Sequence, residues 1–251
     1  MINIVIPMAG RGSRFEAAGY TLPKPLIEVH GTPMIEVVVR NLGLRSPHRF
    51  TFLPLREHLD RFNLAERLER IAPGCAIVPV ESTTEGAACT ILLARGLFEN
   101  EFPLLLANSD QYIHNDMDDF VLDLEHRRLD GLIMTFPADH PKWSYARVAP
   151  NGLVLEVVEK QVVSNHATTG LYYFRRGRDF ARAADRMIAR DFRVNNEFYT
   201  APAFNELIAE GLRIGIHPVA AEGEAMFGMG TPEDLKAFLE RPESRVAAGV
   251  A

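Results

Sequence analysis

The chain has 251 residues, 47% of them hydrophobic and 24% charged, which is ordinary for a folded globular protein and unlike a disordered or fibrous one. A chain of this length supports one sizeable core, or at most two modest domains, and we expect a single domain. The formal net charge of −6 argues against a nucleic-acid partner, and because no run of about 18 apolar residues occurs, no membrane-spanning helix is predicted.

The chain opens with an apolar strand that leads into a glycine-rich turn. The turn carries Gly10 and Gly12, followed by Arg14 and, after a spacer, Lys24. Glycines let backbone N–H groups approach an anion, and the two cations add charge where a pyrophosphate would lie. A dinucleotide fingerprint would need a third glycine where Phe15 stands, and no P-loop sequence is present. The turn predicts a triphosphate site, with a tight turn carrying exposed basic residues as the alternative.

Apolar runs alternate with helical patterns as far as residue 136. Strands are expected over residues 2–6, 50–55, 76–80, 102–107 and 131–136, and helices over residues 33–43, 57–71, 86–98 and 118–129. This alternation predicts an α/β fold with a doubly wound, mostly parallel central sheet. Ligands of such sheets bind beyond the carboxyl ends of the strands, where the glycine turn lies.

Shorter segments follow residue 137 and are typical of antiparallel strands joined by turns. Strands are expected over residues 145–148, 153–157, 170–174 and 213–218, and helices over residues 177–189, 197–210 and 232–239. Residues 241–251 show no convincing apolar face. We therefore expect a single domain over residues 1–240 and a loose tail after it.

A carboxylate stands at the end of the fourth predicted strand, in the sequence Asn108-Ser109-Asp110. Mg²⁺ prefers hard oxygen ligands and is usually held by one or two carboxylates together with phosphate oxygens. Because this strand ends at the same edge as the glycine turn, Asp110 is a candidate Mg²⁺ ligand. A turn or helix-capping aspartate is the alternative.

The segment Ala9-Gly10-Arg11-Gly12-Ser13-Arg14, followed by Pro23-Lys24-Pro25-Leu26, resembles the signature of the sugar-1-phosphate nucleotidylyltransferases, or NDP-sugar pyrophosphorylases. The resemblance extends to about residue 240. It implies a Rossmann-like, GT-A-type nucleotidyltransferase fold with a nucleotide-binding part over about residues 1–136 and a small antiparallel acceptor-binding part over about residues 137–240. In that family the loop and the arginine hold a nucleoside triphosphate, the lysine supports the transfer, and an aspartate in the place of Asp110 binds the metal.

The resemblance also implies a base-binding segment, where Glu81, Glu85 and Gly86 follow the third strand. Gly86 would let the base lie against the backbone. The Glu85 carboxylate would accept hydrogen bonds from the amines of cytosine or guanine, which favours CTP or GTP; a role at the helix start is the alternative. The expected nucleotide contacts are Met8, Ala9, Gly10, Gly12, Ser13, Arg14, Glu81, Glu85, Gly86, Asn108 and Asp110.

The pair Glu159-Lys160 ends another apolar strand. In the resembling family a Glu-Lys pair at this place contacts the sugar phosphate, so Lys160 would hold the acceptor phosphate and Glu159 would accept from hydroxyl groups. A solvated pair on a turn is the alternative. Trp143 would add a stacking wall. The expected acceptor contacts are Tyr145, Glu159, Lys160, Thr169, Gly170, Asn196 and Glu197.

A second metal-binding aspartate often precedes a Thr-Gly-Thr-like turn in this family, but the corresponding residue here is Gly228. Glu197 is the second metal ligand that we expect, with Asp234 as the other substitute. Thr231 and Pro232 make a good helix start, so a role at the helix dipole is the alternative for Asp234.

Together these features predict an Mg²⁺-dependent transfer of a nucleotidyl group from an NTP to a sugar 1-phosphate or a related phosphorylated small molecule, for surface polysaccharide or glycoconjugate synthesis. Arg14, Lys24 and Lys160 are the expected catalytic residues. The alternatives are a nucleotide-sugar-dependent glycosyltransferase and a non-catalytic nucleotide-binding protein. Cys75 and Cys89 lack zinc-site spacing and no signal peptide is visible, so we expect a cytoplasmic protein with no membrane partner, in which an oligomer is compatible with the sequence.

Overall fold

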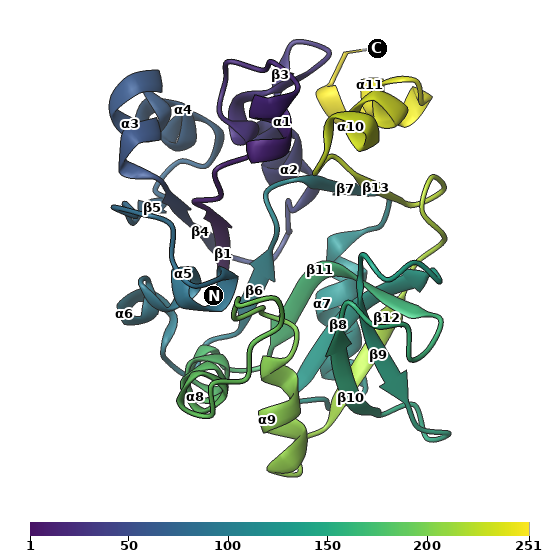
Figure 1. Ribbon diagram of the computed structural model, residues 1–251. Coiled ribbons are helices and arrows are strands. Elements are labelled where there is room, and N and C mark those ends of the chain that lie inside the picture. The colour runs from purple at the N-terminus through teal and green to yellow at the C-terminus, as the bar shows by residue number, and fades with distance from the viewer. Residues whose placement is uncertain (251) are drawn as a thin grey trace.

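The computed structural model describes residues 1–250, which form a sheet of nine strands with helices packed on it (Figure 1). The strands are β1 (Ile2–Met8), β4 (His48–Pro54), β5 (Ala76–Ile77), β6 (Leu104–Ala107), β8 (Gly131–Pro137), β9 (Ser144–Val148), β10 (Val154–Glu159), β11 (His166–Phe174) and β12 (Ile214–Pro218). Their order is β10-β9-β11-β6-β1-β4-β5, and β8 pairs with β11 and β12.

Strands β5, β4, β1 and β6 run parallel to one another, and so do β8 and β12. Strand β11 runs antiparallel to β6, β8 and β9, and joins the two parallel groups. The predicted α/β fold, with a large, mostly parallel central sheet and a few antiparallel strands, is confirmed.

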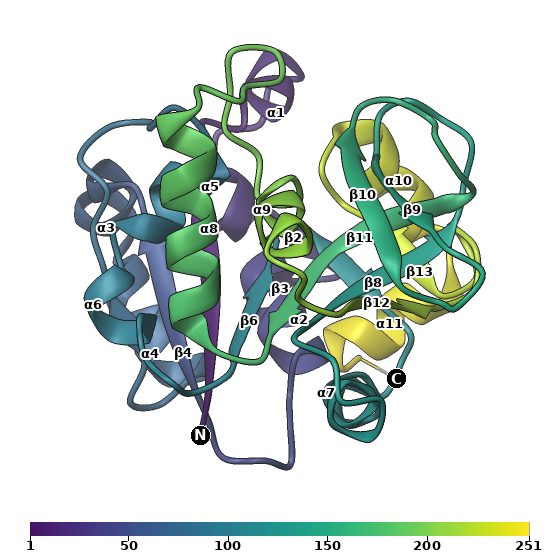
Figure 2. The ribbon, with the colours of Figure 1, turned by 90° about the horizontal axis from the view of Figure 1, so that it is seen from below.

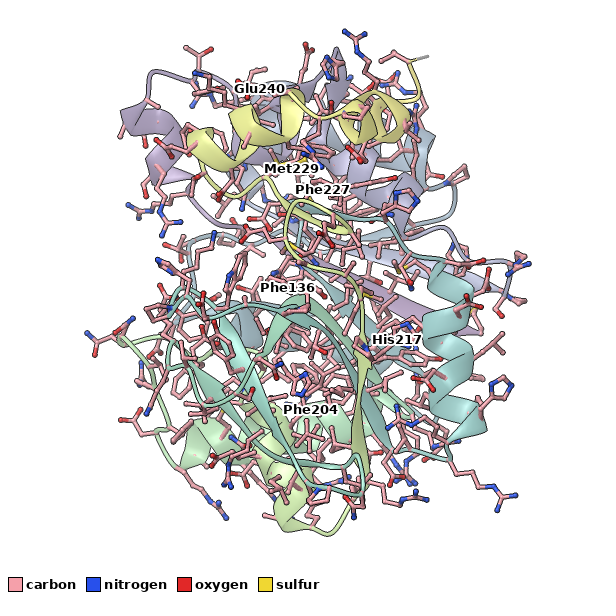
Figure 3. The ribbon with its side chains drawn as sticks, turned by 90° about the vertical axis from the view of Figure 1, so that its right-hand side faces the viewer. Phe136, Phe204, His217, Phe227, Met229 and Glu240 are labelled. Carbon is pink, nitrogen blue, oxygen red and sulfur yellow. The ribbon has the colours of Figure 1, made fainter. Side chains whose placement is uncertain are left out.

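Both faces of the sheet are covered, which explains the near-continuous apolar character of its central strands. On β1, Ile4 and Ile6 face one buried apolar cluster while Val5 faces the other. Phe227 of the first cluster and Phe204 of the second are well separated in Figure 3. Residues in the first cluster come from α2 (Met34–Asn41), α4 (Leu64–Ile71), α7 (Met117–His126), α10 (Pro232–Leu239) and α11 (Pro242–Ala248).

The opposite face is covered by α5 (Ala87–Leu92), α6 (Arg95–Phe98), α8 (Gly177–Ala189) and α9 (Ala203–Ala209). Figure 2 shows α8 lying beside α5 and α6. In residues 1–250 we find no helix that is both long enough and apolar enough to cross a membrane.

Three predicted helices differ from the structure. The helix predicted over residues 86–98 is divided into α5 and α6 by a turn at residues 93–94. The helix predicted over residues 57–71 is divided into α3 (Arg56–Phe62) and α4 at Asn63, whose φ of 48° is left-handed. The helix predicted over residues 197–210 begins only at Ala203, because Glu197 pairs with Val194 and the Phe198 backbone hydrogen-bonds to Glu85 and Ala88. Asn195 and Asn196, with φ angles of 48° and 63°, form the turn between Val194 and Glu197. Asparagine tolerates this conformation, and apolar periodicity alone does not reveal it.

The prediction of a loose tail was wrong for its described part, residues 241–250. Helix α11 buries Ala247 and Ala248 against α2, and the Ala248 carbonyl accepts hydrogen bonds from the Thr32 hydroxyl at 3.0 Å and the Arg40 guanidinium at 2.9 Å. Small alanine side chains give a weak apolar pattern, so only the tertiary contacts reveal this helix.

Short elements that sequence periodicity did not predict surround the glycine turn and Asp110. They are α1 (Ser13–Ala17), the 3-10 helix η1 (Lys24–Leu26), β2 (Glu28–Val29), β3 (Thr32–Pro33), β7 (Gln111–Ile113) and β13 (Met226–Gly228). Strands β7 and β13 form an antiparallel ribbon in which Gln111 lies opposite Gly228. This ribbon brings the segment before α10 to Asp110, where the Met229 N–H donates to the Asp110 carbonyl at 2.7 Å.

Candidate active site

Two of the predicted site residues meet at the carboxyl ends of β1 and β6. These strands are parallel neighbours, so the glycine turn after β1 and the segment Asn108–Asp110 after β6 leave the sheet at the same edge. The Lys24 ammonium donates to the Asp110 carboxylate at 2.8 Å, and both side chains are about one-fifth exposed, at 20% and 22%. Partial burial strengthens this pair relative to a fully solvated one.

The conformation of the glycine turn depends on Gly12. Its φ of 67° is left-handed, and a Cβ built there would lie 3.3 Å from the Lys24 Cβ. A side chain at Gly12 would therefore strain the backbone and press on the lysine. A Cβ at Gly10 would meet nothing within 4 Å, so this part of the turn borders open space that an anion can enter.

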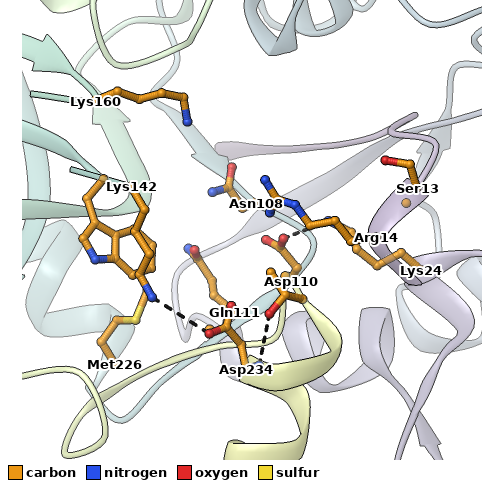
Figure 4. A pocket seen from close by; sticks show the side chains of 15 residues that line it. Ser13, Arg14, Lys24, Asn108, Asp110, Gln111, Lys142, Lys160, Met226 and Asp234 are labelled. Atoms are coloured by element: carbon orange, nitrogen blue, oxygen red, sulfur yellow. Dashed lines mark hydrogen bonds and ion pairs between the residues drawn. The ribbon is translucent and has the colours of Figure 1, made fainter. Parts of the chain in front are cut away.

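Two cavities meet at Lys24, Asn108 and Asp110. The glycine-loop cavity, of about 590 Å³, is lined by residues 7–11, Lys24, residues 83–84, 86–87 and 90, residues 108–110 and Glu197. The lysine cavity, of about 410 Å³ (Figure 4), is lined by residues 12–14, Lys24, Asn108, residues 110–111, residues 142–143, Lys160, and residues 226, 228, 230–231 and 234.

Lys160 enters the lysine cavity from the end of β10. Its φ of 56° turns the chain off the strand, and its N–H donates to the Trp143 carbonyl at 3.0 Å. The ammonium lies 3.8 Å from a Glu159 carboxylate oxygen and 5.1 Å from the centre of the Tyr199 ring. With 34% of its side chain exposed, Lys160 can exchange these contacts for an anion in the cavity.

Lys142 and Asp234 form a wall of the lysine cavity. Asp234 was predicted as an alternative second metal ligand, whereas Lys142 was not predicted. The Lys142 ammonium lies 3.1 Å from a Glu222 carboxylate oxygen, 3.9 Å from one of Asp234 and 4.5 Å from the centre of the Trp143 ring. These residues come from separate stretches of the chain, so no local motif could have joined them. The face of the Trp143 ring, which we expected to stack on the acceptor, contacts the Lys142 ammonium in this structure.

Two glycines of the lysine cavity lie beside two aspartates. A Cβ at Gly230 would lie 2.9 Å from an Asp110 carboxylate oxygen, and one at Gly228 would lie 4.0 Å from an Asp234 oxygen. Gln111 lies beside them, and its buried Nε2 has no hydrogen-bond partner among residues 1–250. Gln111 was not among the predicted site residues, because its only signal in the sequence is its position directly after Asp110.

Several predicted acceptor contacts are buried behind the cavity wall. Tyr145 is fully buried in an apolar cluster and its hydroxyl donates to the His140 carbonyl at 2.7 Å. The Thr169 hydroxyl donates to the Met134 carbonyl at 3.3 Å. The Glu159 carboxylate, 4% exposed, accepts a hydrogen bond from the Ser144 hydroxyl, and burial raises the pKa of this carboxyl. In this conformation none of the three side chains faces the lysine cavity as the structure describes it.

Gly170 and Asn196 also have structural positions. A Cβ at Gly170, where φ is 90°, would lie 2.2 Å from the Asn108 amide nitrogen, so the glycine leaves room for Asn108 in both cavities. Asn196 lies in the left-handed turn before α9, whereas the neighbouring Glu197 lines the glycine-loop cavity.

The predicted base-binding segment divides into residues that do and do not face a cavity. A Cβ at Gly86, where φ is 137°, would lie 2.5 Å from both the N and the O of Phe198, so this glycine permits a close backbone contact. The Glu85 carboxylate forms an ion pair with Arg193 and is 64% exposed. Glu81 lines a third cavity, of about 690 Å³. Residues 11–12 of the glycine turn, Lys24 and residues 82–83 line the same cavity.

Comparisons with known proteins agree with this geometry. A family model described as nucleotidyl transferase matches residues 4–198. The nucleoside-diphosphate-sugar pyrophosphorylase from Vibrio cholerae RC9 is similar in structure, with a TM-score of 0.82 and 29% identity, over 95% of this chain and 100% of that one. A candidate glucose-1-phosphate thymidylyltransferase from Bacillus anthracis has a TM-score of 0.76 and 17% identity, over 100% and 97% of the chains, which shows the fold alone.

One curated relative adds a short sequence match. The 2-aminoethylphosphonate cytidylyltransferase of Lancefieldella rimae is 45% identical to this chain over 49 residues. That match spans 20% of this chain and 20% of the relative.

The buried carboxyl of Glu159 predicts a pH-dependent stability. Because burial raises its pKa, the folded protein holds the Glu159 proton more tightly than the unfolded chain does. The stability that this proton contributes is fully present below pH 4.5, the ordinary pKa of the group, and is lost as the pH rises through the pKa of the folded state. Glu159→Gln should therefore raise the melting temperature at pH 7 by about 2–4 °C, the effect of ~1 kcal/mol in a domain of this size. Near pH 4 the two proteins should converge. Calorimetry at both pH values checks this, with Glu28→Gln at an exposed position of β2 as the control. A lower melting temperature of Glu159→Gln at pH 7 would contradict the prediction.

Proposed function

Since this chain belongs to the nucleotidyl transferase family and is a nucleotidyltransferase of the NDP-sugar pyrophosphorylase type, we propose that it couples an NTP to a sugar 1-phosphate or a related phosphorylated small molecule. The products are an NDP-activated compound and pyrophosphate. The observation that carries this proposal is the Lys24–Asp110 pair at the junction of the glycine-loop cavity and the lysine cavity. A triphosphate in the first cavity and an acceptor in the second would meet there.

The proposed reaction is an in-line displacement at the α-phosphorus. An acceptor phosphate oxygen forms the new P–O bond while the bond from the α-phosphorus to the oxygen that bridges it to the β-phosphorus breaks. That oxygen leaves with the pyrophosphate. Because the acceptor phosphate is already ionised, the protein does not have to remove a proton, and its contribution is positioning and charge stabilisation.

Three cations at the junction perform these tasks in our proposal. Arg14 and Lys24 line the lysine cavity beside the glycine turn and stabilise the charge on the leaving pyrophosphate. Lys160, which comes from the β10 side of the same cavity, holds the acceptor phosphate. Lys24 exchanges its Asp110 contact for phosphate oxygens, so one anionic partner replaces another.

A divalent metal ion, which enzymes of this family generally use, fits the donors at the junction. Asp110 and Glu197 line the glycine-loop cavity together, and the missing Cβ at Gly230 leaves the space beside the Asp110 carboxylate open. Residues 1–250 contain no group of three or more His, Cys, Asp or Glu side chains placed to hold a metal, so nucleotide phosphate oxygens complete the ligand set in our proposal. A bound Mg²⁺ supplies neutralisation of phosphate charge.

The base is read by Glu81 in this proposal, in place of Glu85. Both carboxylates form ion pairs, Glu81 with Arg56 at 2.9 Å and Glu85 with Arg193. Glu81 lines the cavity that reaches the glycine turn, whereas Glu85 lines none of the three cavities described above. A carboxylate accepts from the amine of cytosine or guanine and repels the O4 atom of uracil or thymine. CTP or GTP is therefore preferred, and the short match to a cytidylyltransferase supports CTP. A role in polysaccharide or glycoconjugate synthesis and a cytoplasmic location stay predictions.

Pyrophosphate release from a matrix of NTPs and phosphorylated acceptors, such as glucose 1-phosphate, with Mg²⁺ tests the proposed reaction. Lys24→Ala should lower kcat by ~10²–10³, the usual cost of losing a charge stabiliser at the transition state. Lys236→Ala, on the exposed side of α10, is the control. Release of a nucleoside phosphate in place of pyrophosphate would indicate a glycosyltransferase, and a loss below about threefold would remove Lys24 from the mechanism.

The metal ligands are tested by titrating Mn²⁺ with CTP present and measuring bound metal by electron paramagnetic resonance. Asp110→Asn and Glu197→Gln should each weaken Mn²⁺ binding by at least about tenfold, because a neutral amide is a poor ligand for a hard cation. Asp234→Asn should change it by less than about threefold, since Asp234 contacts Lys142. If Asp234→Asn has the larger effect, the second carboxylate belongs to Asp234.

Base selection is tested by comparing kcat/KM for CTP and UTP. Glu81→Gln should reduce the preference for CTP over UTP, because a carboxylate only accepts hydrogen bonds whereas the amide can also donate one to O4. Glu85→Gln is the matched control and should keep the wild-type ratio. A reduced ratio in Glu85→Gln alone would return base recognition to Glu85.

A further inference from the structure

Lys142 occupies a site built for a cation. The site, which we call the cation box, consists of the Trp143 ring and the Glu222 and Asp234 carboxylates. The Lys142 ammonium lies 4.5 Å from the ring centre, 3.1 Å from a Glu222 oxygen and 3.9 Å from an Asp234 oxygen. An aromatic face with carboxylates beside it is the combination that proteins use to hold alkylammonium groups.

The cation box opens on the lysine cavity. Lys142, Trp143 and Asp234 all line that cavity, as do Lys160 and Asp110. In Figure 4 the Lys142 ammonium lies next to Asp234, at the wall of the opening that Lys160 also enters. An acceptor whose phosphate is held by Lys160 would therefore extend its other end along the wall that contains the cation box.

The occupied box rejects one class of acceptor. Lys142 is covalently attached to the loop that carries Trp143, so it competes for the box at a high effective concentration. A ligand ammonium would have to displace it or to lie beside a like charge. A hydroxyl group meets neither penalty, and nearby Gln111 has a buried amide nitrogen without a partner in the described chain.

Resting on the proposed function, we propose that Lys142 is a specificity-determining residue. By filling the cation box it excludes phosphorylated acceptors that end in an ammonium group. It thereby selects acceptors whose far end carries hydroxyl groups, as a sugar phosphate does. The charge of Lys142, and not only its bulk, is what excludes the ammonium.

The test uses two probes that differ only at the far end, 2-aminoethylphosphonate and 2-hydroxyethylphosphonate. Trp143 is the single tryptophan of the chain, so intrinsic fluorescence reports on the cation box directly. Titration without a nucleotide should give wild type a Kd at least about threefold lower for the hydroxyl probe. Lys142→Met removes the positive charge from the box at a similar side-chain length, and should shift the ratio of the two Kd values by about tenfold or more toward the amino probe.

Two further variants make the test specific. Lys142→Arg keeps the charge and should keep the wild-type ratio, and Lys236→Met, on the exposed face of α10, should keep it as well. An unchanged ratio in Lys142→Met overturns the proposal. A wild-type preference for the amino probe, or no saturable fluorescence change with either probe in Lys142→Met, overturns it too.

The outcome is separable from that of the proposed function, because the titration needs neither nucleotide nor turnover. A shifted ratio in a protein that never releases pyrophosphate would support the cation box and reject the proposed reaction. Pyrophosphate release by a protein in which Lys142→Met leaves the ratio of the two Kd values unchanged would support the proposed reaction and reject the role of the cation box.

Discussion

The contact between the Lys24 ammonium and the Asp110 carboxylate is the interaction on which the rest of the site depends. It exists because β1 and β6 are parallel neighbours, so that the chain leaves both strands at one edge of the sheet. Each side chain alone would be an ordinary exposed charge. Held 2.8 Å apart and about four-fifths buried, they define the junction at which the glycine-loop cavity and the lysine cavity meet.

At three glycines the chain passes so close to a neighbouring segment that no side chain would fit, and these contacts connect the later half of the chain to the junction. Gly86 lies against the backbone of Phe198, Gly170 beside the Asn108 amide and Gly230 beside the Asp110 carboxylate. At each place a Cβ would come within 3 Å of a neighbouring atom. These contacts, with the β7–β13 ribbon, place the antiparallel part of the protein against the parallel part, so that one cavity has walls from both.

The lysines of the lysine cavity share one electrostatic arrangement. Lys24 contacts Asp110, Lys160 lies near Glu159, and Lys142 lies between Glu222 and Asp234. The carboxylates keep several positive charges close together without a bound anion. Lys24 and Lys160 can exchange a carboxylate for a phosphate, whereas the Lys142 ammonium lies against two carboxylates and a ring although 40% of its side chain is exposed. The three lysines are therefore suited to different tasks.

The sequence by itself determined the α/β class, most strands, the family and the residues that the glycine turn and Asp110 contribute. These follow from local signals: apolar periodicity, a glycine turn with cations, and a carboxylate at a strand end. Only the tertiary structure decided which side chains face the cavities. It turned Tyr145, Thr169 and Glu159 into the interior, formed a helix from residues 242–248, and joined Lys142 to Glu222 and Asp234. Such choices depend on packing and charge between residues far apart in the chain, which a local pattern does not encode.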